Sequence, residues 1–433
     1  MSVEMIGFLA LILVLILIFL RVPVTISMLL VSFLGIYFLR GFAPLNTAIH
    51  TIIWNQSFSY LLTTIPMFIL MGEFIYMSGI SQEIFNMFRK WFGRLKGGLG
   101  ISTVGASAMF AAASGSSVAT TGTIGVMALK EMQKYGYSNS LASGTIAAGG
   151  TLGILIPPST SFIIYGMLTE QSIGRLLIAG IVPGILLTIF FMLTVYLSIM
   201  LQPNLAAEGE RVPLKEKFKS LSKVIWIMIV FLVVIGGMYM GWFSPTEAAG
   251  VGAVSTFLIA LFRRKMTRDL FIASVSRTLS TTGFIFAIIL GSFLLNYLLT
   301  ITRVPILIAD FLTSSSLSPL MILILIILMY IILGALMDAL AMIVVTIPIV
   351  IPVIQALGYD LVWFGVIIVL VIELALITPP IGMNIFVLKG IAPDLKIGEI
   401  FLGASRFIIA IVVLITILII FPELALFLPD RVG

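Results

Sequence analysis

The sequence predicts an all-α integral membrane protein with many crossings, because the chain is long, strongly apolar and poor in charge. Of its 433 residues, 61% are hydrophobic and only 10% are charged, whereas about a quarter of the residues in a soluble domain are charged. The mean hydropathy of +1.24 indicates the same class. Since one crossing takes about 20 residues, the chain supplies roughly ten to twelve spans and leaves almost no room for a soluble catalytic domain.

Two residue types on which many enzymes depend are nearly missing. Cysteine is absent and His50 is the only histidine, which excludes thiolate chemistry and cysteine-ligated metals and leaves a serine hydrolase triad without its base. We therefore expect no enzyme, no catalytic residue and no cofactor. The net charge of +6 is interpreted as a topology signal rather than as a sign of nucleic-acid binding.

Long apolar runs predict ten crossings, and two further apolar stretches predict re-entrant hairpins. The stretches 97–134 and 319–356 are too long for one span, and their halves are short for two, so each is expected to enter and leave on the same side. The segments Ser114 to Ser117 and Gly334 to Asp338 interrupt them near their middles. The crossings lie at about 3–20, 24–39, 61–79, 139–165, 176–201, 224–242, 246–262, 280–301, 361–388 and 402–428.

Counting basic residues along this topology predicts the orientation in the membrane. If the hairpins do not cross, one face collects twenty lysines and arginines and the other only four, which are Arg40, Arg175, Arg303 and Arg431. Basic residues concentrate on the cytoplasmic side of membrane proteins. Both termini are therefore expected in the periplasm, and the polar linker 203–222 in the cytoplasm.

An internal repeat divides the chain at that linker, into a first repeat 1–202 and a second repeat 223–433. A shift of 222 residues superposes Pro23 on Pro245, Gly136 on Gly358 and Pro157-Pro158 on Pro379-Pro380 without a gap. Each half carries five crossings and one hairpin, and this odd number of crossings inverts the second copy. Inverted repeats with broken helices are typical of secondary transporters. The alternative is chance recurrence of prolines and glycines.

One amphipathic segment precedes each hairpin. Residues 80–96 place Ile84, Phe88, Trp91, Phe92 and Leu95 on one helical side and basic residues on the others, which predicts a helix in the membrane interface. A plain cytoplasmic loop is the alternative. The counterpart around Ile306 to Leu312 is shorter and is expected on the outside.

Two double prolines lie inside apolar runs, in the words GGTLGILIPPS (149–159) and LITPPIGMN (376–384). Each pair removes two backbone donors, so the helices 139–165 and 361–388 are expected to break within the bilayer. Freed carbonyls are tolerated there only against protein, water or a bound ion. Together with the hydroxyls of the first hairpin tip and Asp338 of the second, they offer two sets of oxygens for a hard cation such as Na⁺. Close packing is the competing interpretation, and we favour it for small residues such as Gly105 and Gly144.

Four acidic residues fall within predicted spans, where carboxylates are functional candidates. Asp338 is the best of them, as a sodium-site or gating group, and Glu373 is a proton-relay or structural group. Glu247 is expected to cap a helix, and Glu73 to be a buried hydrogen-bond partner. No basic residue lies near the expected midplane, although Arg277 near an interface, or a partner subunit, remains an alternative contact for an anion.

The words GSSVATTG, GGTLGILIPPS, GALMDALAM and LITPPIGMNIFVLKGIAPD resemble the large membrane subunit, of DctM or SiaM type, of tripartite ATP-independent periplasmic (TRAP) transporters. The likeness covers essentially the whole chain. It implies a sodium-coupled importer of C4-dicarboxylates, sialic acids or related carboxylates that works by an elevator motion in the bacterial inner membrane. It also implies two separate partners, a small four-helix membrane subunit and a periplasmic substrate-binding protein.

Carried onto this sequence, the resemblance implies two sodium sites and one substrate site. The first sodium site lies between the tip residues Ser114, Ser116 and Ser117 and the residues Gly153, Ile156 and Pro158 of the first break. The second lies between Gly334, Asp338, Thr378, Pro380 and Met383. The substrate site is formed by Ser116, Ser117, Thr151, Ser159, Asp338 and Asn384.

Three other functions stay open at this stage. A transporter of organic anions driven by protons through Asp338 or Glu373, without a binding protein, is the close rival. A passive channel and an intramembrane hydrolase with a serine at Gly115-Ser116-Ser117 are the others. The hydrolase lacks a histidine on a neighbouring span.

Overall fold

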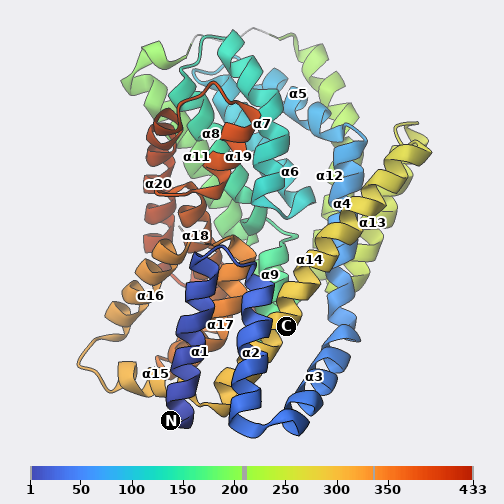
Figure 1. The fold of residues 1–433 in the computed structure, drawn as a ribbon. Helices are drawn as coiled ribbons and strands as arrows, with labels where there is room; N and C mark the ends of the chain where they lie inside the picture. The colour runs from blue at the N-terminus through green and yellow to red at the C-terminus, as the bar shows by residue number, and fades with distance from the viewer. Residues whose placement is uncertain (1, 207–211, 335–336, 432–433) are drawn as a thin grey trace.

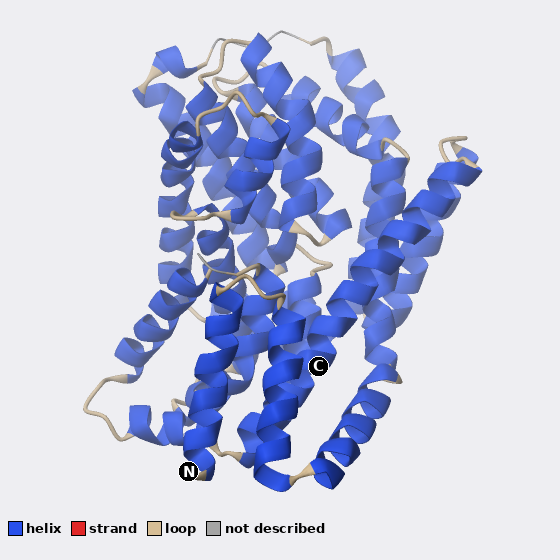
Figure 2. Ribbon diagram, in the orientation of Figure 1, coloured by secondary structure: helices blue, strands red, loops and turns tan. Residues whose placement is uncertain are grey.

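The computed structural model describes residues 2–206, 212–334 and 337–431, and every regular element among them is a helix (Figure 2). No strand is present in these ranges, which confirms the predicted all-α class. The helices form two groups, built from both halves of the chain and joined by two short connecting helices (Figure 1).

The first group, which we call the helical frame, holds the helices that precede the hairpin in each half. It consists of α1 (Val3–Phe19), α2 (Val24–Arg40), α3 (Phe42–Ser57), α4 (Thr64–Met77) with a 3-10 turn (Tyr60–Thr63) before it, α12 (Leu214–Tyr239), α13 (Pro245–Phe262) and α14 (Arg268–Ile301). Helix α14 packs against α2, α3 and α4, and α13 packs against α4 and α12. The frame therefore interleaves helices of both halves.

The second group, which we call the hairpin body, contains the hairpins and the broken helices. Its first-half members are α6 (Gly98–Ser114), α7 (Ser117–Lys134), α8 (Asn139–Leu155), α9 (Thr160–Thr169), α10 (Ile173–Ala179) and α11 (Ile181–Leu201), followed by a 3-10 turn (Pro203–Leu205). Its second-half members are α16 (Pro319–Leu333), α17 (Ala339–Ala356), α18 (Leu361–Ile377), α19 (Met383–Ile391), α20 (Ile397–Ile420) and α21 (Glu423–Leu426), with a last 3-10 turn (Pro429–Arg431).

The connecting helices α5 (Ile80–Phe92) and α15 (Val304–Thr313) join the frame to the hairpins. The helix at 80–92 rules out the loop alternative, and α15 is the shorter of the two, as expected. The prediction that Leu95 belongs to the apolar side of this helix is wrong, because Leu95 lies beyond the end of α5 and is 49% exposed. Helix α5 buries Ile84 and Phe85 against protein, because α6 and α12 cover that side.

Both hairpins and both helix breaks lie where the sequence predicts them. Helices α6 and α7 fold back at Gly115, whose φ of +57° is a left-handed conformation that favours glycine. Helices α16 and α17 fold back at 334–338, of which 335–336 fall outside the described residues. Helix α8 ends before Pro157-Pro158, where the chain bends by 40° into α9, and α18 ends before Pro379-Pro380.

The helix boundaries recur at the shift of 222 residues. Helices α7 and α17 begin at 117 and 339 and end at 134 and 356, and helices α8 and α18 span 139–155 and 361–377. The two hairpins enter the molecule from opposite ends (Figure 1), which confirms the predicted inversion. One difference between the halves is that the first has α3 and α4 where the second has the continuous α14. Pro66 has no N–H to donate to the carbonyl of Leu62, whereas Ile288 stands at the equivalent position.

The lengths of the described helices account for most of the predicted crossings. Seven helices are long and apolar enough to cross a membrane, and the bent pair α8–α9 makes an eighth span. One of the seven, α17, is half of a hairpin. The other expected crossings fall on α1, α2 and the pair α18–α19, whose helices are each shorter than the seven.

Ion pairs gather basic residues at the end of the molecule that holds α5 and the start of α12 (Figure 1). Arg89 pairs with Glu131 at 2.8 Å, Lys90 with Glu216 at 2.9 Å and Arg263 with Glu83 at 2.7 Å. The charge count assigns these three basic residues to one face. The pair between Arg89 and Glu131 also fastens α5 to the hairpin helix α7.

Helices α8 and α18 form the centre of the hairpin body, and all residues from 141 to 155 and from 362 to 377 are buried. Helix α8 is rich in glycine and alanine, so its neighbours approach closely. A methyl group on Gly144 would overlap the backbone of Gly403 and lie 2.7 Å from the amide nitrogen of Ala404 in α20. This contact confirms the packing role expected of Gly144.

We predict that Gly144→Ala lowers the melting temperature of the purified protein by several degrees, because overpacking a rigid backbone contact costs about 1–3 kcal/mol. Gly250→Ala is the matched control, since nothing lies within 4 Å of a methyl group at Gly250. There the better helix propensity of alanine stabilises α13 by up to about 1 kcal/mol. Tryptophan fluorescence during heating in detergent measures both, and equal melting temperatures would contradict the close α8–α20 packing.

Candidate functional site

The first hairpin tip is docked directly onto the first helix break. A methyl group on Gly115 would lie 2.7 Å from the carbonyl oxygen of Pro158, and one on Gly153 would lie 2.8 Å from the amide nitrogen of Ser117. The hydroxyl of Thr160, the first residue of α9, donates to the carbonyl of Gly115 at 3.1 Å. The structure thus brings together the tip, Gly153 and Pro158, as the sequence predicts.

Hydroxyls order the tip from within. The hydroxyls of Ser114 and Thr120 lie 2.9 Å apart, and Thr120 donates to the carbonyl of Ser116 at 2.8 Å. The Ser116 side chain accepts from the amide of Ala119 and so caps α7. The tip is therefore an ordered turn whose oxygens are fixed in place.

The double proline of the first break removes the donors to two backbone carbonyls, and only one of the two is replaced. In an unbroken helix, Pro157 and Pro158 would be the residues that donate to the carbonyls of Gly153 and Ile154. The Ser159 hydroxyl takes over for Ile154, donating at 2.5 Å. Among the described residues, nothing donates to the carbonyl of Gly153. This free oxygen lies where α8 meets the hairpin tip.

Three further predicted residues of the first half have packing contacts. Ile156 packs its side chain against Gly184 of α11. Thr151 is fully buried and donates to the carbonyl of Ala148 in its own helix. Ser159 is also fully buried and caps α9 by accepting from Phe162.

The second tip and the second break repeat the arrangement with different side chains. Asp338 caps α17, since its carboxylate accepts from the amides of Leu340 and Ala341 at 3.0 and 3.1 Å. Gly334 packs against Ala375 of α18. In the break, the carbonyl oxygens of Leu376 and Thr378 each lie 3.3 Å from the position a methyl group would take on Gly382. Two backbone oxygens therefore point at one position.

Pro380 is the reason one of these oxygens is free. It occupies the position from which an amide would donate to Leu376, and within the described chain no other group donates there. The Thr378 hydroxyl instead donates to Leu374 at 2.6 Å. In each break, the described residues thus replace one of the two donors lost to proline, and the carbonyl of Gly153 or Leu376 is the one left without a donor.

Ser117 and Asn384 join the two halves inside the hairpin body. Both are buried, at 3% and 0% exposure, and their side chains share two short contacts, of 3.0 Å to the amide oxygen and 2.7 Å to the amide nitrogen. The amide of Asn384 also donates to the carbonyl of Ala147 in α8 at 3.1 Å. Substrate reaches this pair only if the surrounding helices separate.

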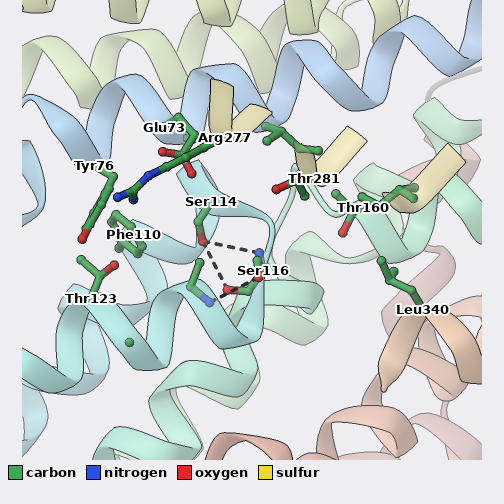
Figure 3. Close-up of a pocket in the computed structure, with 15 residues that line it drawn as sticks. Glu73, Tyr76, Phe110, Ser114, Ser116, Thr123, Thr160, Arg277, Thr281 and Leu340 are labelled. Carbon is green, nitrogen blue, oxygen red and sulfur yellow. Dashed lines mark hydrogen bonds between the residues drawn. The ribbon is translucent and has the colours of Figure 1, made fainter. Parts of the chain in front are cut away.

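A cavity of about 470 Å³ lies between the frame and the first hairpin tip (Figure 3). The hairpin body lines it with hydroxyls, and the frame lines it with both hydroxyls and charges. The contributions of the hairpin body are Ser114, Ser116, Thr123 and Thr160. Those of the frame are Glu73 and Tyr76 of α4 and Arg277 and Thr281 of α14.

A second cavity of about 350 Å³ lies between the frame and the second hairpin tip. Gly334, Asp338 and Met383 line it, together with Arg21 from the turn between α1 and α2. The structure therefore does not bring the predicted substrate residues into one site. Ser116 lies in the first cavity, Asp338 in the second, and Ser117 with Asn384 between the helices, while Thr151 and Ser159 are fully buried and line neither cavity.

The sequence named Arg277 only as an alternative, and the structure places it in the wall of the first cavity. The available signal was the run SVSRTLSTT (274–282), which is polar although it lies in an otherwise apolar helix. Glu247 caps α13 in a reciprocal capping box with Ser244, as expected. Glu373 is fully buried in α18, neither of its carboxylate oxygens has a hydrogen-bond partner among the described residues, and it lines neither cavity described here.

Comparison with known proteins identifies the family. A family model described as "Tripartite ATP-independent periplasmic transporter, DctM component" matches residues 11–424. The C4-dicarboxylate TRAP transporter large permease protein DctM of Pseudomonas aeruginosa is 34% identical over 385 residues, which are 88% of this chain and 89% of that protein. The sialic acid TRAP transporter large permease protein SiaM of Vibrio cholerae is 30% identical over 415 residues, 96% of each chain.

A solved structure shares the fold at much lower sequence identity. The YdaH transporter of Alcanivorax borkumensis superposes with a TM-score of 0.59 at 14% identity, covering 89% of this chain and 90% of that one. The relatives are transport proteins, which confirms the prediction of a multi-pass membrane transporter that is not an enzyme. The chain belongs to the DctM family, the large permease subunits of TRAP transporters.

Proposed function

We propose that this chain is a sodium-coupled permease that imports an organic acid, such as a C4-dicarboxylate, a sialic acid or a related carboxylate, across the bacterial inner membrane. The single observation that carries the proposal is the pair of helix breaks, each beside a hairpin tip and each with carbonyls that no described group donates to, among them Gly153 and Leu376. Such oxygens inside a membrane protein call for a ligand, and Na⁺ prefers neutral oxygens.

The oxygens around each break suit one sodium ion apiece. At the first break, Gly153, whose carbonyl accepts from no described group, packs against the backbone of Ser116 and Ser117. At the second, the carbonyls of Leu376 and Thr378 point toward one position next to Gly382. In this proposal Na⁺ is a transported ion and not a resident cofactor, so it binds and leaves in every cycle.

The first cavity supplies what an organic acid needs. Three helices begin at its wall, since Ser116 caps α7, Thr160 opens α9 and Leu340 is the second residue of α17. Helix N-termini carry partial positive charge and free N–H groups, which favour carboxylates. Hydroxyls of the hairpin body complete the set of donors.

The boundary between frame and hairpin body suits an elevator motion. Both cavities lie at this boundary, and α5 and α15 are the short helices that connect the two groups. In this proposal the hairpin body carries substrate and sodium past the frame. The two repeats, 1–202 and 223–433, face opposite ways, with both termini periplasmic and the linker 203–222 cytoplasmic.

Two protein partners belong to the proposal. The word tripartite in the family description supports a small four-helix membrane subunit beside the frame and a periplasmic protein that delivers the substrate. The exposed apolar faces of the helices contact membrane lipid. In this proposal Na⁺ is the coupling ion, and the protein uses no cofactor.

The decisive experiment is uptake into proteoliposomes that contain this chain, its small subunit and its binding protein. We expect radiolabelled succinate or N-acetylneuraminate to accumulate above its external concentration when Na⁺ is imposed outside. A passive channel would only equilibrate the solute. Uptake driven equally by a pH gradient without Na⁺ would favour the proton-coupled alternative, for which the unpartnered Glu373 would be the candidate group.

Removing one side chain at either tip is expected to reduce transport. Ser117→Ala removes the donor to the amide oxygen of Asn384, and a buried polar group without a partner costs about 1–3 kcal/mol, enough for about a tenfold loss of rate. Asp338→Ala removes the cap of α17. Ser222→Ala is the control, because Ser222 is exposed and lies at the end of the predicted linker, within the first turns of α12. Initial uptake rates at equal reconstituted protein check this, and equal rates for all three variants would contradict these sites.

A methyl group beside the first break is expected to weaken sodium binding specifically. Gly153→Ala places its Cβ against the backbone of Ser116 and Ser117 and separates the tip from the free carbonyl. The Na⁺ concentration for half-maximal uptake should rise about tenfold, whereas Gly250→Ala should leave it unchanged. A normal Na⁺ dependence in Gly153→Ala would exclude this oxygen set.

A further inference from the structure

The charged side chains of the first cavity come from the frame alone. Glu73 and Arg277 lie on α4 and α14, whereas the hairpin body contributes only uncharged groups to this wall. In the close-up the two charged side chains lie next to each other, and the guanidinium end of Arg277 lies beside Tyr76 (Figure 3). A fixed cation of the frame therefore shares this cavity with the hydroxyls of Ser114 and Ser116.

Arg277 has no ion-pair partner in the part of the chain that the structure describes. No carboxylate lies within salt-bridge distance of its guanidinium group. Its recorded contact is the ring of Tyr76, whose centroid is 5.7 Å from the guanidinium carbon. Glu73 likewise has a buried carboxylate oxygen with no hydrogen-bond partner. Intramembrane arginines are rare, face cavities and mark substrate pathways.

The position of Arg277 along α14 explains how its charge is accommodated. The helix has 34 residues, so at 1.5 Å per residue it is about 50 Å long and exceeds the hydrocarbon thickness. Arg277 is the tenth residue, roughly 15 Å from the end that begins at Arg268. Ser276 and Ser280 are exposed beside it, so the neighbours of Arg277 along the helix include hydroxyl-bearing residues.

We propose that Arg277 is an anion-binding residue of the frame, which contacts the carboxylate of the transported organic acid when the hairpin body stands as in this structure. Glu73 is its counter-charge while no cargo is present. This inference rests on the proposed function for the identity of the anion. The cation itself, and its access to water, are testable without any substrate.

The chain contains no cysteine, so one introduced cysteine reports on the cavity alone. Thr281→Cys lies one turn after Arg277 in the same cavity wall. Its rate of reaction with the anionic reagent MTSES, divided by that with the cationic reagent MTSET, measures the local potential. A positive charge about 6 Å from the reagent in water attracts MTSES and repels MTSET, so Arg277→Gln should lower this ratio roughly tenfold. Glu73→Gln removes a negative charge and should raise the ratio.

Arg268→Gln is the matched control, because it removes the same charge from the same helix outside the cavity wall. It should leave the MTSES to MTSET ratio unchanged. A ratio that is insensitive to Arg277→Gln would overturn the proposal. So would a cysteine at 281 that neither reagent modifies, because the cavity would then be closed to water.

Transport kinetics test the contact with cargo. With succinate or N-acetylneuraminate, whichever the unmodified complex accumulates, Arg277→Gln should raise KM at least fivefold and leave the half-saturating Na⁺ concentration unchanged. Arg277→Lys should restore part of the loss, since it keeps the charge. A lower maximal rate at unchanged KM would indicate a merely structural role and refute cargo binding. If the unmodified complex accumulates neither acid, the proposed function fails, while the labelling ratio still decides whether the cation is there.

Discussion

The arrangement of this permease depends on how the backbone is satisfied at two interruptions within apolar helices. A double proline removes two donors in each of α8 and α18, and neither hydrocarbon nor apolar side chains replace them. The protein compensates with specific neighbours. The Ser159 hydroxyl bonds to Ile154, the amide of Thr378 bonds to Ala375, and the first hairpin tip docks on its break through Gly115. Carbonyls such as those of Gly153 and Leu376 receive no donor from the described residues, and in the proposed function they make each interruption a sodium site as well as a bend.

The same constraint explains why the hairpin body mixes helices from both halves. A helix break is shielded from lipid only when other helices surround it. Helices of the other half of the chain provide part of this cover. Ser117 bonds to Asn384 across the halves, and the hydroxyl of Tyr165 donates to the carbonyl of Leu361 at 2.6 Å. In a low-dielectric interior such bonds are strong, and leaving them unmade is costly. The halves therefore hold each other as one body, although their centres differ, with small residues in α8 and large ones in α18.

Most of the fold could be predicted from the sequence, because prolines, glycines and the length of apolar runs determine helix ends and breaks locally. The double prolines located both breaks, and the 222-residue shift placed α7 on α17 and α8 on α18. Residues whose environment is set by tertiary packing were less accessible. Leu95 was assigned to the apolar side of a helix that ends before it. The cavity wall formed by Glu73 and Arg277 depends on how α4 crosses α14, and residue periodicity along one helix contains no information on that crossing.

The division of charge between frame and hairpin body has a physical consequence for a moving carrier. An ionised side chain on the moving part has to change its environment in every cycle, at a cost of several kcal/mol whenever it leaves water or a partner. Hydroxyls, backbone carbonyls and helix N-termini attract ions without carrying a net charge themselves. At the first cavity the hairpin body contributes only such groups, so in the proposed function sodium and an organic anion bound there together neutralise each other. In the same proposal, a fixed Arg277 on the frame contributes its attraction at one position of the body only, which favours arrival or release of the anion there without adding charge to the body.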